Sequence, residues 1–161
     1  MLLQYIVNGI TLGSIYALMA IGYAMVFSIL ELINFSHGQV FMLGGIFGLY
    51  ALQLIPGPAA LAILVAVLLT GVVGIGVEQI AIRPLRNRKA STVSALITTL
   101  GMGIFIENIV LIVFGSDYKA FEPPFEVHNL EFLNTRITTL ELLIVGLSIV
   151  LMIVLNFFIF K

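Results

Sequence analysis

Five long apolar runs, separated by short polar stretches, make up most of this 161-residue chain. A helix needs about 20 mostly apolar residues to cross the hydrocarbon core of a bilayer. The pattern therefore predicts an all-α fold, a polytopic membrane helix bundle with about five transmembrane helices in a single domain, residues 1–161. We place the helices at residues 5–29, 37–54, 59–82, 92–114 and 139–160.

A polar stretch from Glu31 to Gln39 separates the first two runs. Ser36 followed three residues later by Gln39 matches a capping box, so we expect the second helix to begin here with the Ser36 side chain as its cap. Two interpretations stay open: a capped turn at the membrane surface, or a functional break of the helix within the membrane. The candidates for such a break, or for the lining of a translocation path, are Asn34, Ser36, His37 and Gly38.

Small residues recur at intervals of four in the first two runs. This spacing places each set on one face of a helix and lets a neighbouring helix approach closely. A packing seam explains these residues better than direct contact with a substrate. The predicted helix-packing positions are Gly9, Gly13 and Ala17 in the first run, and Gly44 and Gly48 in the second.

The fourth run carries a stripe of small and polar residues with the same spacing of four. Its Glu107 is notable, because charged groups at membrane depth are rare and usually face the protein interior or a water-filled cavity. The alternative is a carboxyl group bonded to a neighbouring helix or placed near the outer headgroups. The stripe is Ser91, Ala95, Thr99, Gly103 and Glu107, of which Thr99, Gly103 and Glu107 are further candidates for a translocation path.

Four of the seven Lys and Arg residues lie in one short cluster after the third run. Lys and Arg in short loops favour the cytoplasmic side of a membrane. We therefore expect residues 83–89 and 31–38 on the cytoplasmic side, and the N-terminus and the polar loop of residues 115–138 outside. The residues that set this topology are Arg83, Arg86, Arg88 and Lys89.

Composition indicates a membrane protein, and no constellation of catalytic residues appears in the sequence. Hydrophobic residues are 61% and charged residues 9%, whereas soluble domains have about 45–50% apolar and about 25% charged residues. The chain has no cysteine, no nucleotide-binding motif, and its His37 and His128 are predicted on opposite sides. We therefore expect no catalytic, cofactor or metal site, and the net charge of −1 gives no indication of nucleic-acid binding.

Several motifs in order resemble the permease subunits of high-affinity branched-chain amino acid ABC importers, of the LivH-like type. The resemblance covers essentially the whole chain. The Asn-Phe-Ser-His-Gly and Arg-Pro-Leu signatures, in this order and at this separation, are specific for that family. The residues that carry it are 8–23, 33–38, 78–85, 96–101 and 107–108.

The resemblance implies one subunit of a heteromeric importer in a prokaryotic inner membrane. Its partners would be a second, LivM-like permease, two cytoplasmic ATPase subunits and an extracytoplasmic binding protein for leucine, isoleucine or valine. Family members are longer, and a coupling loop would follow near Lys161, so we expect the N-terminal half of such a permease. Urea and short-chain amide permeases look similar. A channel, a secondary carrier and a non-transporting membrane fragment stay open as well.

Overall fold

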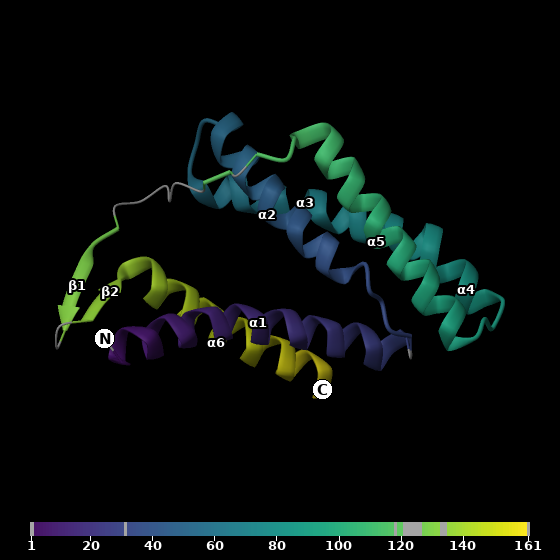
Figure 1. The fold of residues 1–161 in the computed structure, drawn as a ribbon, viewed down its shortest axis with the longest axis horizontal. Coiled ribbons are helices and arrows are strands. Elements are labelled where there is room, and N and C mark those ends of the chain that lie inside the picture. Colours follow the sequence, from purple (N-terminus) through teal and green to yellow (C-terminus); the bar gives the residue numbers. More distant parts are fainter. Residues whose placement is uncertain (1, 31, 118, 121–126, 133–134, 161) are drawn as a thin grey trace. The chain divides into compact units, whose positions relative to one another are not determined.

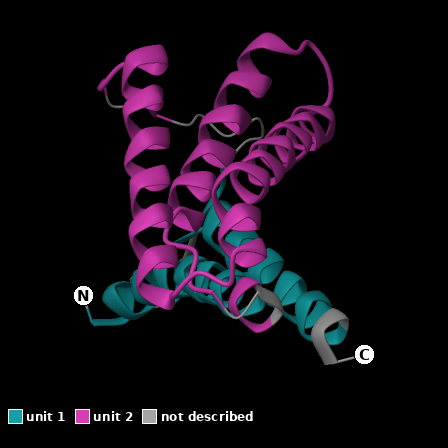
Figure 2. Ribbon diagram, turned by 90° about the vertical axis from the view of Figure 1, so that its right-hand side faces the viewer, with its two compact units in different colours: residues 1–25, 125–161 teal, residues 26–124 magenta. Residues whose placement is uncertain are grey.

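A computed structural model describes residues 2–30, 32–117, 119–120, 127–132 and 135–160. Glu31 and residues 121–126 of the predicted outer loop lie outside the described residues. The chain divides into two compact units, residues 1–25 with 125–161, and residues 26–124 (Figure 2). Each unit is described by itself below.

Five long helices account for most of the chain, and the predicted all-α class is confirmed (Figure 1). Four of them, the third together with its continuation to Asn87, are long and apolar enough to cross a membrane. The exception is the second helix, whose 18 residues include the polar side chains of His37, Gln39 and Gln53, and its crossing stays a prediction. The helices are α1 (Leu2–Leu30), α2 (His37–Leu54), α3 (Ala59–Val77), α5 (Thr92–Phe114) and α6 (Thr139–Phe160).

Helix α3 does not end at Ile82, as the sequence predicted, but continues through a π-helical turn η1 (Glu78–Ile82) into α4 (Arg83–Asn87). Pro84 has no N–H to donate, and its ring crowds the carbonyl of the residue four positions earlier. A π turn is wider than an α turn, so the helix passes this proline without breaking. The predicted 83–89 loop is therefore helical as far as Asn87.

The unit of residues 26–124 is built around α2, α3 and α5. Short apolar side chains from α2, the α3–η1 segment and α5 form its buried cluster. The rings of Tyr50 and Phe114 add a contact with centroids 5.1 Å apart. The buried residues of the cluster are Leu43, Val77, Ala81, Ile82, Ile106 and Val110.

The other unit contains a β-hairpin, within residues for which the sequence predicts only a polar loop. Strands β1 (Asn129–Phe132) and β2 (Thr135–Thr138) pair antiparallel, with Asn129 opposite Thr138. The side-chain amide of Gln4 in α1 binds the outer edge of β2: it accepts from the Arg136 N–H at 3.0 Å and donates to the Arg136 carbonyl at 3.0 Å. One glutamine thus pairs with the strand edge as a backbone would.

Helix α6 begins with a reciprocal capping box. The Thr138 N–H donates to Glu141 Oε2 at 2.7 Å, and the Glu141 N–H donates to Thr138 Oγ1 at 3.2 Å. This Thr-x-x-Glu pattern satisfies two backbone donors that a helix start leaves unpaired. The same Thr138 is the last residue of β2, so the capping box joins the hairpin to the helix.

We expect Glu141→Ala to loosen the first turn of α6, because it removes the acceptor for the Thr138 N–H. The expected cost is about 1 kcal/mol, which corresponds to roughly fivefold faster amide exchange there. Hydrogen–deuterium exchange of the detergent-solubilised chain measures it. Glu141→Gln keeps an amide oxygen as acceptor and is the control. Equal exchange in Glu141→Ala and in the unaltered chain would show that the capping box does not hold the helix start.

Candidate functional site

Asn34 organises the turn that leads into α2. Its Oδ1 accepts from the Ser36 N–H at 3.1 Å and from the Ser36 hydroxyl at 2.6 Å. Its carbonyl accepts from the His37 N–H at 3.3 Å. One side chain therefore holds the residues that precede the helix.

The prediction that the Ser36 side chain caps α2 is wrong. Ser36 occupies the N-cap position but makes no side-chain cap hydrogen bond, and its backbone (φ −76°, ψ −4°) is already helical. A capping side chain needs an extended backbone at this position to reach the next turn. Because the Ser36 hydroxyl donates to Asn34 instead, the capping function passes to Asn34, two residues earlier.

Thr99 of α5 meets this turn from the other side. Its hydroxyl lies 2.9 Å from the Ala95 carbonyl and 3.4 Å from the Ile33 carbonyl. Thr99 is 2% exposed and Ser36 is fully buried. Asn34 and Ser36 of the turn thus share one polar seam with Thr99, a path candidate more than 60 residues away in the sequence.

Gly103 lies one turn further along α5, against the side chain of Gln39. A Cβ atom added to Gly103 would be 3.0 Å from Gln39 Oε1 and 3.2 Å from Gln39 Cδ. The amide of Gln39 therefore occupies the space that a side chain at position 103 would need. In the described part of the chain, Gln39 Oε1 is buried without a hydrogen-bond partner.

Gln39 is the residue of this seam that the sequence analysis missed as a site candidate. Its position in the sequence predicts only a capping box with Ser36, which does not form. The sequence did contain an indication of its role, since glutamine is uncommon in apolar runs and Gly103 of α5 leaves room for its side chain. The link is visible only once α2 and α5 are packed together.

Glu107 does not join this seam. The buried face of α5 passes from Gly103 to Ile106 and Val110, and Glu107 is exposed in this chain. Residues spaced by four drift by about 40° per step around an α-helix, because a turn takes 3.6 residues. That Glu107 faces a cavity or a partner rather than lipid stays a prediction.

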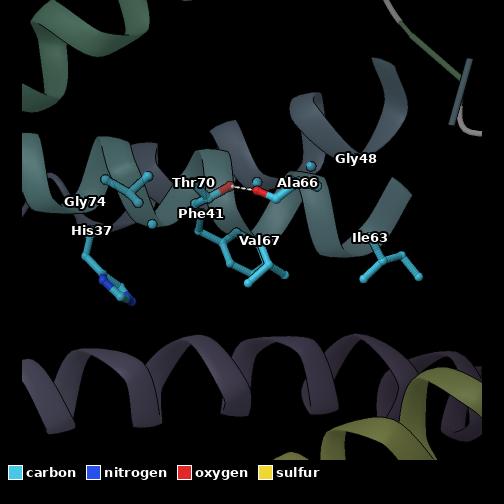
Figure 3. A pocket seen from close by; sticks show the side chains of 12 residues that line it. His37, Phe41, Gly48, Ile63, Ala66, Val67, Thr70 and Gly74 are labelled. Atoms are coloured by element: carbon cyan, nitrogen blue, oxygen red, sulfur yellow. Dashed lines mark hydrogen bonds between the residues drawn. The ribbon is translucent and has the colours of Figure 1, made fainter. Parts of the chain in front are cut away.

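A groove of about 640 Å³ runs between α2 and α3 (Figure 3). His37 and Gly74 line one end of it, and Gly48 and Ile63 line the other. The site thus combines a polar turn at the start of α2 with an apolar groove along α2, and His37 lies where the two meet.

Glycines shape much of this groove. A Cβ added to Gly44 would lie 3.5 Å from the Thr70 hydroxyl, whereas one added to Gly48 or Gly74 would meet no atom within 4 Å. The Thr70 hydroxyl donates to the Ala66 carbonyl at 2.7 Å (Figure 3). The groove wall is therefore apolar and leaves backbone accessible.

The predicted packing residues of α1 have no closely packed neighbour in their own unit. Cβ atoms added to Gly9 or Gly13 would meet nothing within 4 Å, so close packing of Gly9, Gly13 and Ala17 stays a prediction. Polar side chains of this helix bond to its own backbone, as the Thr11 hydroxyl does to the Val7 carbonyl at 3.0 Å. The helix thus needs no second helix to satisfy that group.

The basic cluster is exposed along α4, which begins at Arg83, and in the turn after it. Its Arg86 pairs with Glu78, with Nη2 and Oε1 3.2 Å apart. The partner of Glu78 is thus not Arg83, which is nearer to it in the sequence. Among the described residues, no group of three or more His, Asp or Glu side chains could hold a metal ion.

Residues 5–160 match the family described as the branched-chain amino acid transport system permease component. The chain belongs to this family. A multi-pass membrane protein follows from that membership together with the four long apolar helices. The resemblance read from the Asn34–Gly38 and Arg83–Leu85 signatures is thereby confirmed.

Relatives of this permease chain carry the same description. The high-affinity branched-chain amino acid transport system permease protein LivH of Escherichia coli K12 is 38% identical over 169 residues. LivH of Salmonella typhimurium is 37% identical, and in both cases the match covers 98% of this chain and 54% of the relative. BraD of Pseudomonas aeruginosa is 39% identical over 73% of this chain and 40% of its own length.

The chain thus spans about half the length of the curated relatives that it matches. No solved structure matches it.

The contact between Gly103 and Gln39 can be tested by adding one methyl group. We expect Gly103→Ala to be less stable than Gly101→Ala by about 1–3 kcal/mol, because the new Cβ would lie 3.0 Å from Gln39 Oε1 and forces that amide to move. Gly101→Ala is the matched control, since a Cβ there meets nothing within 4 Å and alanine is favoured over glycine in a helix by about 0.5–1 kcal/mol. The thermal unfolding midpoint in detergent measures both.

Shortening Gln39 should rescue the substitution. We expect Gly103→Ala combined with Gln39→Ala to unfold at a higher temperature than Gly103→Ala alone, because the clash is gone. If Gly103→Ala is as stable as Gly101→Ala, the amide of Gln39 does not occupy the space beside position 103 in the folded chain.

Proposed function

We propose that the chain is a transmembrane permease subunit of an ATP-driven importer for leucine, isoleucine and valine, and forms part of the translocation path. The observation that carries the proposal is the family match over residues 5–160. The relatives are named as high-affinity branched-chain amino acid transport permeases. Since the chain spans about half their length, transport and substrate are proposed for it here.

The site offers complementary surfaces for such a substrate. The apolar groove between α2 and α3 suits an aliphatic side chain, which has no polar atom to satisfy. The N-terminus of α2, at His37, carries roughly half a positive charge and can attract a carboxylate, as broken helices do in some transporters. Urea and short amides are small and polar and would leave this apolar wall uncovered, so the groove favours branched-chain amino acids.

The polar seam would form the wall beside that groove. Asn34 holds Ser36, and Thr99 contacts the same turn through the Ile33 carbonyl. Ser36 and Thr99 are buried, so a substrate that approaches the turn would meet Asn34, whose orientation is fixed by its hydrogen bonds to Ser36. We propose that His37, which lines the groove, and Gly38 belong to the same part of the path, and that Glu107 contributes where α5 faces a partner.

The proposed partners follow from the type of importer. They are a second related permease, two cytoplasmic ATPase subunits and an extracytoplasmic substrate-binding protein. ATP hydrolysis would occur on the ATPase subunits, so the chain itself would be a transport subunit without enzymatic activity. Its many exposed large apolar side chains, such as Ile112 at 83% exposure, suit contact with lipid or with partner helices.

Topology follows from the basic cluster. We propose a multi-pass protein of a prokaryotic inner membrane, with residues 83–89 inside and residues 115–138 outside. We expect a single cysteine at Asn87 to react with an impermeant thiol reagent only after the cells are opened, and one at Asn129 to react in intact cells. The chain has no cysteine of its own, so labelling has no background. Labelling of position 87 in intact cells would refute this orientation.

Transport is tested in the cells that make the chain. We expect deletion of its gene to reduce ATP-dependent leucine uptake to background while uptake of urea and acetamide is unchanged. Expression of the unaltered gene from a plasmid should restore leucine uptake. Loss of urea or acetamide uptake with normal leucine uptake would assign the chain to an amide importer. Unchanged uptake of leucine, urea and acetamide would show that the chain has no role in the transport of these solutes.

A further inference from the structure

The end of the α3–η1–α4 segment presents positive charge that the proposed transport function does not use. Four cationic side chains lie within seven residues, and all four are exposed. We propose that three of them, Arg83, Arg88 and Lys89, form a binding site for the phosphate headgroups of anionic phospholipids. The proposal does not depend on which solute is transported.

The segment places this charge at the depth of lipid headgroups. Residues Ala59–Asn87 form one continuous helical stretch of 29 residues that is apolar enough to cross a membrane. About 20 residues span the hydrocarbon core, so the last turn, which begins at Arg83, and Arg88 directly after it emerge where the headgroups are. Long cationic side chains extend from such helix ends to the interface.

One cation of the cluster is already neutralised, and three are not. Arg86 Nη2 lies 3.2 Å from Glu78 Oε1. No carboxylate lies within ion-pair distance of Arg83, Arg88 or Lys89 in the described part of the chain. Guanidinium groups bind phosphate oxygens in pairs, so Arg83 and Arg88 suit phosphodiester headgroups, and Lys89 adds a third positive charge.

The backbone supplies an independent observation at Lys89. The helix ends in a Schellman motif, in which the Lys89 N–H donates to the Arg86 carbonyl and the Ala90 N–H to the Leu85 carbonyl. Lys89 has the left-handed φ of +50° that this motif requires, a position at which glycine or asparagine is usual. Lysine is strained there, and such a local conflict is characteristic of a residue retained for its function.

Lipid is favoured over a protein partner because headgroups surround the end of any spanning helix. Each Lys or Arg near an anionic membrane surface contributes about 1 kcal/mol, or roughly a fivefold preference for anionic lipid. Three free cations are therefore enough for a clear preference over zwitterionic lipid.

The experiment uses the full chain in nanodiscs of equimolar phosphatidylglycerol and phosphatidylcholine. Native mass spectrometry after release compares the amounts of the two lipids that stay bound. We expect the unaltered chain to retain phosphatidylglycerol preferentially. The triple variant with Arg83, Arg88 and Lys89 changed to Gln should lose that preference by about fivefold for each cation removed.

The chain offers a matched control, because its other three cations lie elsewhere in the sequence. Changing Lys119, Arg136 and Lys161 to Gln alters the net charge by the same amount and should leave the preference nearly unchanged. An equal loss in both triple variants would mean that net charge alone attracts the lipid and would overturn the site. So would an unaltered chain without preference for phosphatidylglycerol.

The Lys89→Gly variant distinguishes an effect of the lost charge on lipid binding from an effect on folding. Glycine adopts the left-handed backbone of residue 89 without strain, so this variant should unfold at the same or a higher temperature. We expect it to lose about fivefold of the preference for phosphatidylglycerol. A stable Lys89→Gly variant with unchanged preference would exclude Lys89 from the site.

The triple variant of Arg83, Arg88 and Lys89 also distinguishes lipid from protein. If its lipid preference is unchanged but an ATPase subunit no longer copurifies with it, the cluster contacts a protein instead.

Discussion

A polar group in an apolar chain must find its hydrogen-bond partner inside the protein, and this constraint shapes the whole structure. The hydroxyls of Thr11, Ser14 and Thr70 all donate to the carbonyl one turn earlier in their own helix. A hydroxyl satisfied in this way needs no second helix. Contacts between helices can then depend on shape, which is what glycine and alanine provide along α2, α3 and α5.

Two places depart from this self-sufficiency, and they adjoin each other. Asn34 satisfies Ser36 in the turn before α2, and Thr99 reaches across to the Ile33 carbonyl. Beside them, Gln39 Oε1 is buried without a partner in the described part of the chain. An unpaired buried acceptor costs about 1–3 kcal/mol. The seam between the turn and α5 is therefore held partly by shape, through Gly103.

The sequence predicted the long helices well because their signal is an unbroken apolar run. The fifth helix begins at Thr139 as predicted, and Gly115 ends the fourth. Most of what was missed depends on geometry that such runs do not encode. The π turn follows from Pro84 clashing within a continuing helix. The capping role of Asn34 depends on which of two neighbouring polar side chains reaches the backbone. Among the missed features, only the Thr138–Glu141 capping box follows a pattern that is visible in the sequence itself.

The site candidates divide in the same way. Asn34, Ser36, Thr99 and Gly103 come together because a turn and a helix face each other, whereas Glu107 leaves that face by the drift of an α-helix. The helices thus present two kinds of apolar surface. Along α3, Leu64, Leu68 and Val72 are exposed and branched, which suits fluid lipid chains. The glycine-lined groove beside them exposes backbone instead, and a bulky lipid tail gains few contacts there. Exposed branched side chains thus mark a surface suited to lipid, whereas the glycine-lined groove suits a solute or a closely packed helix.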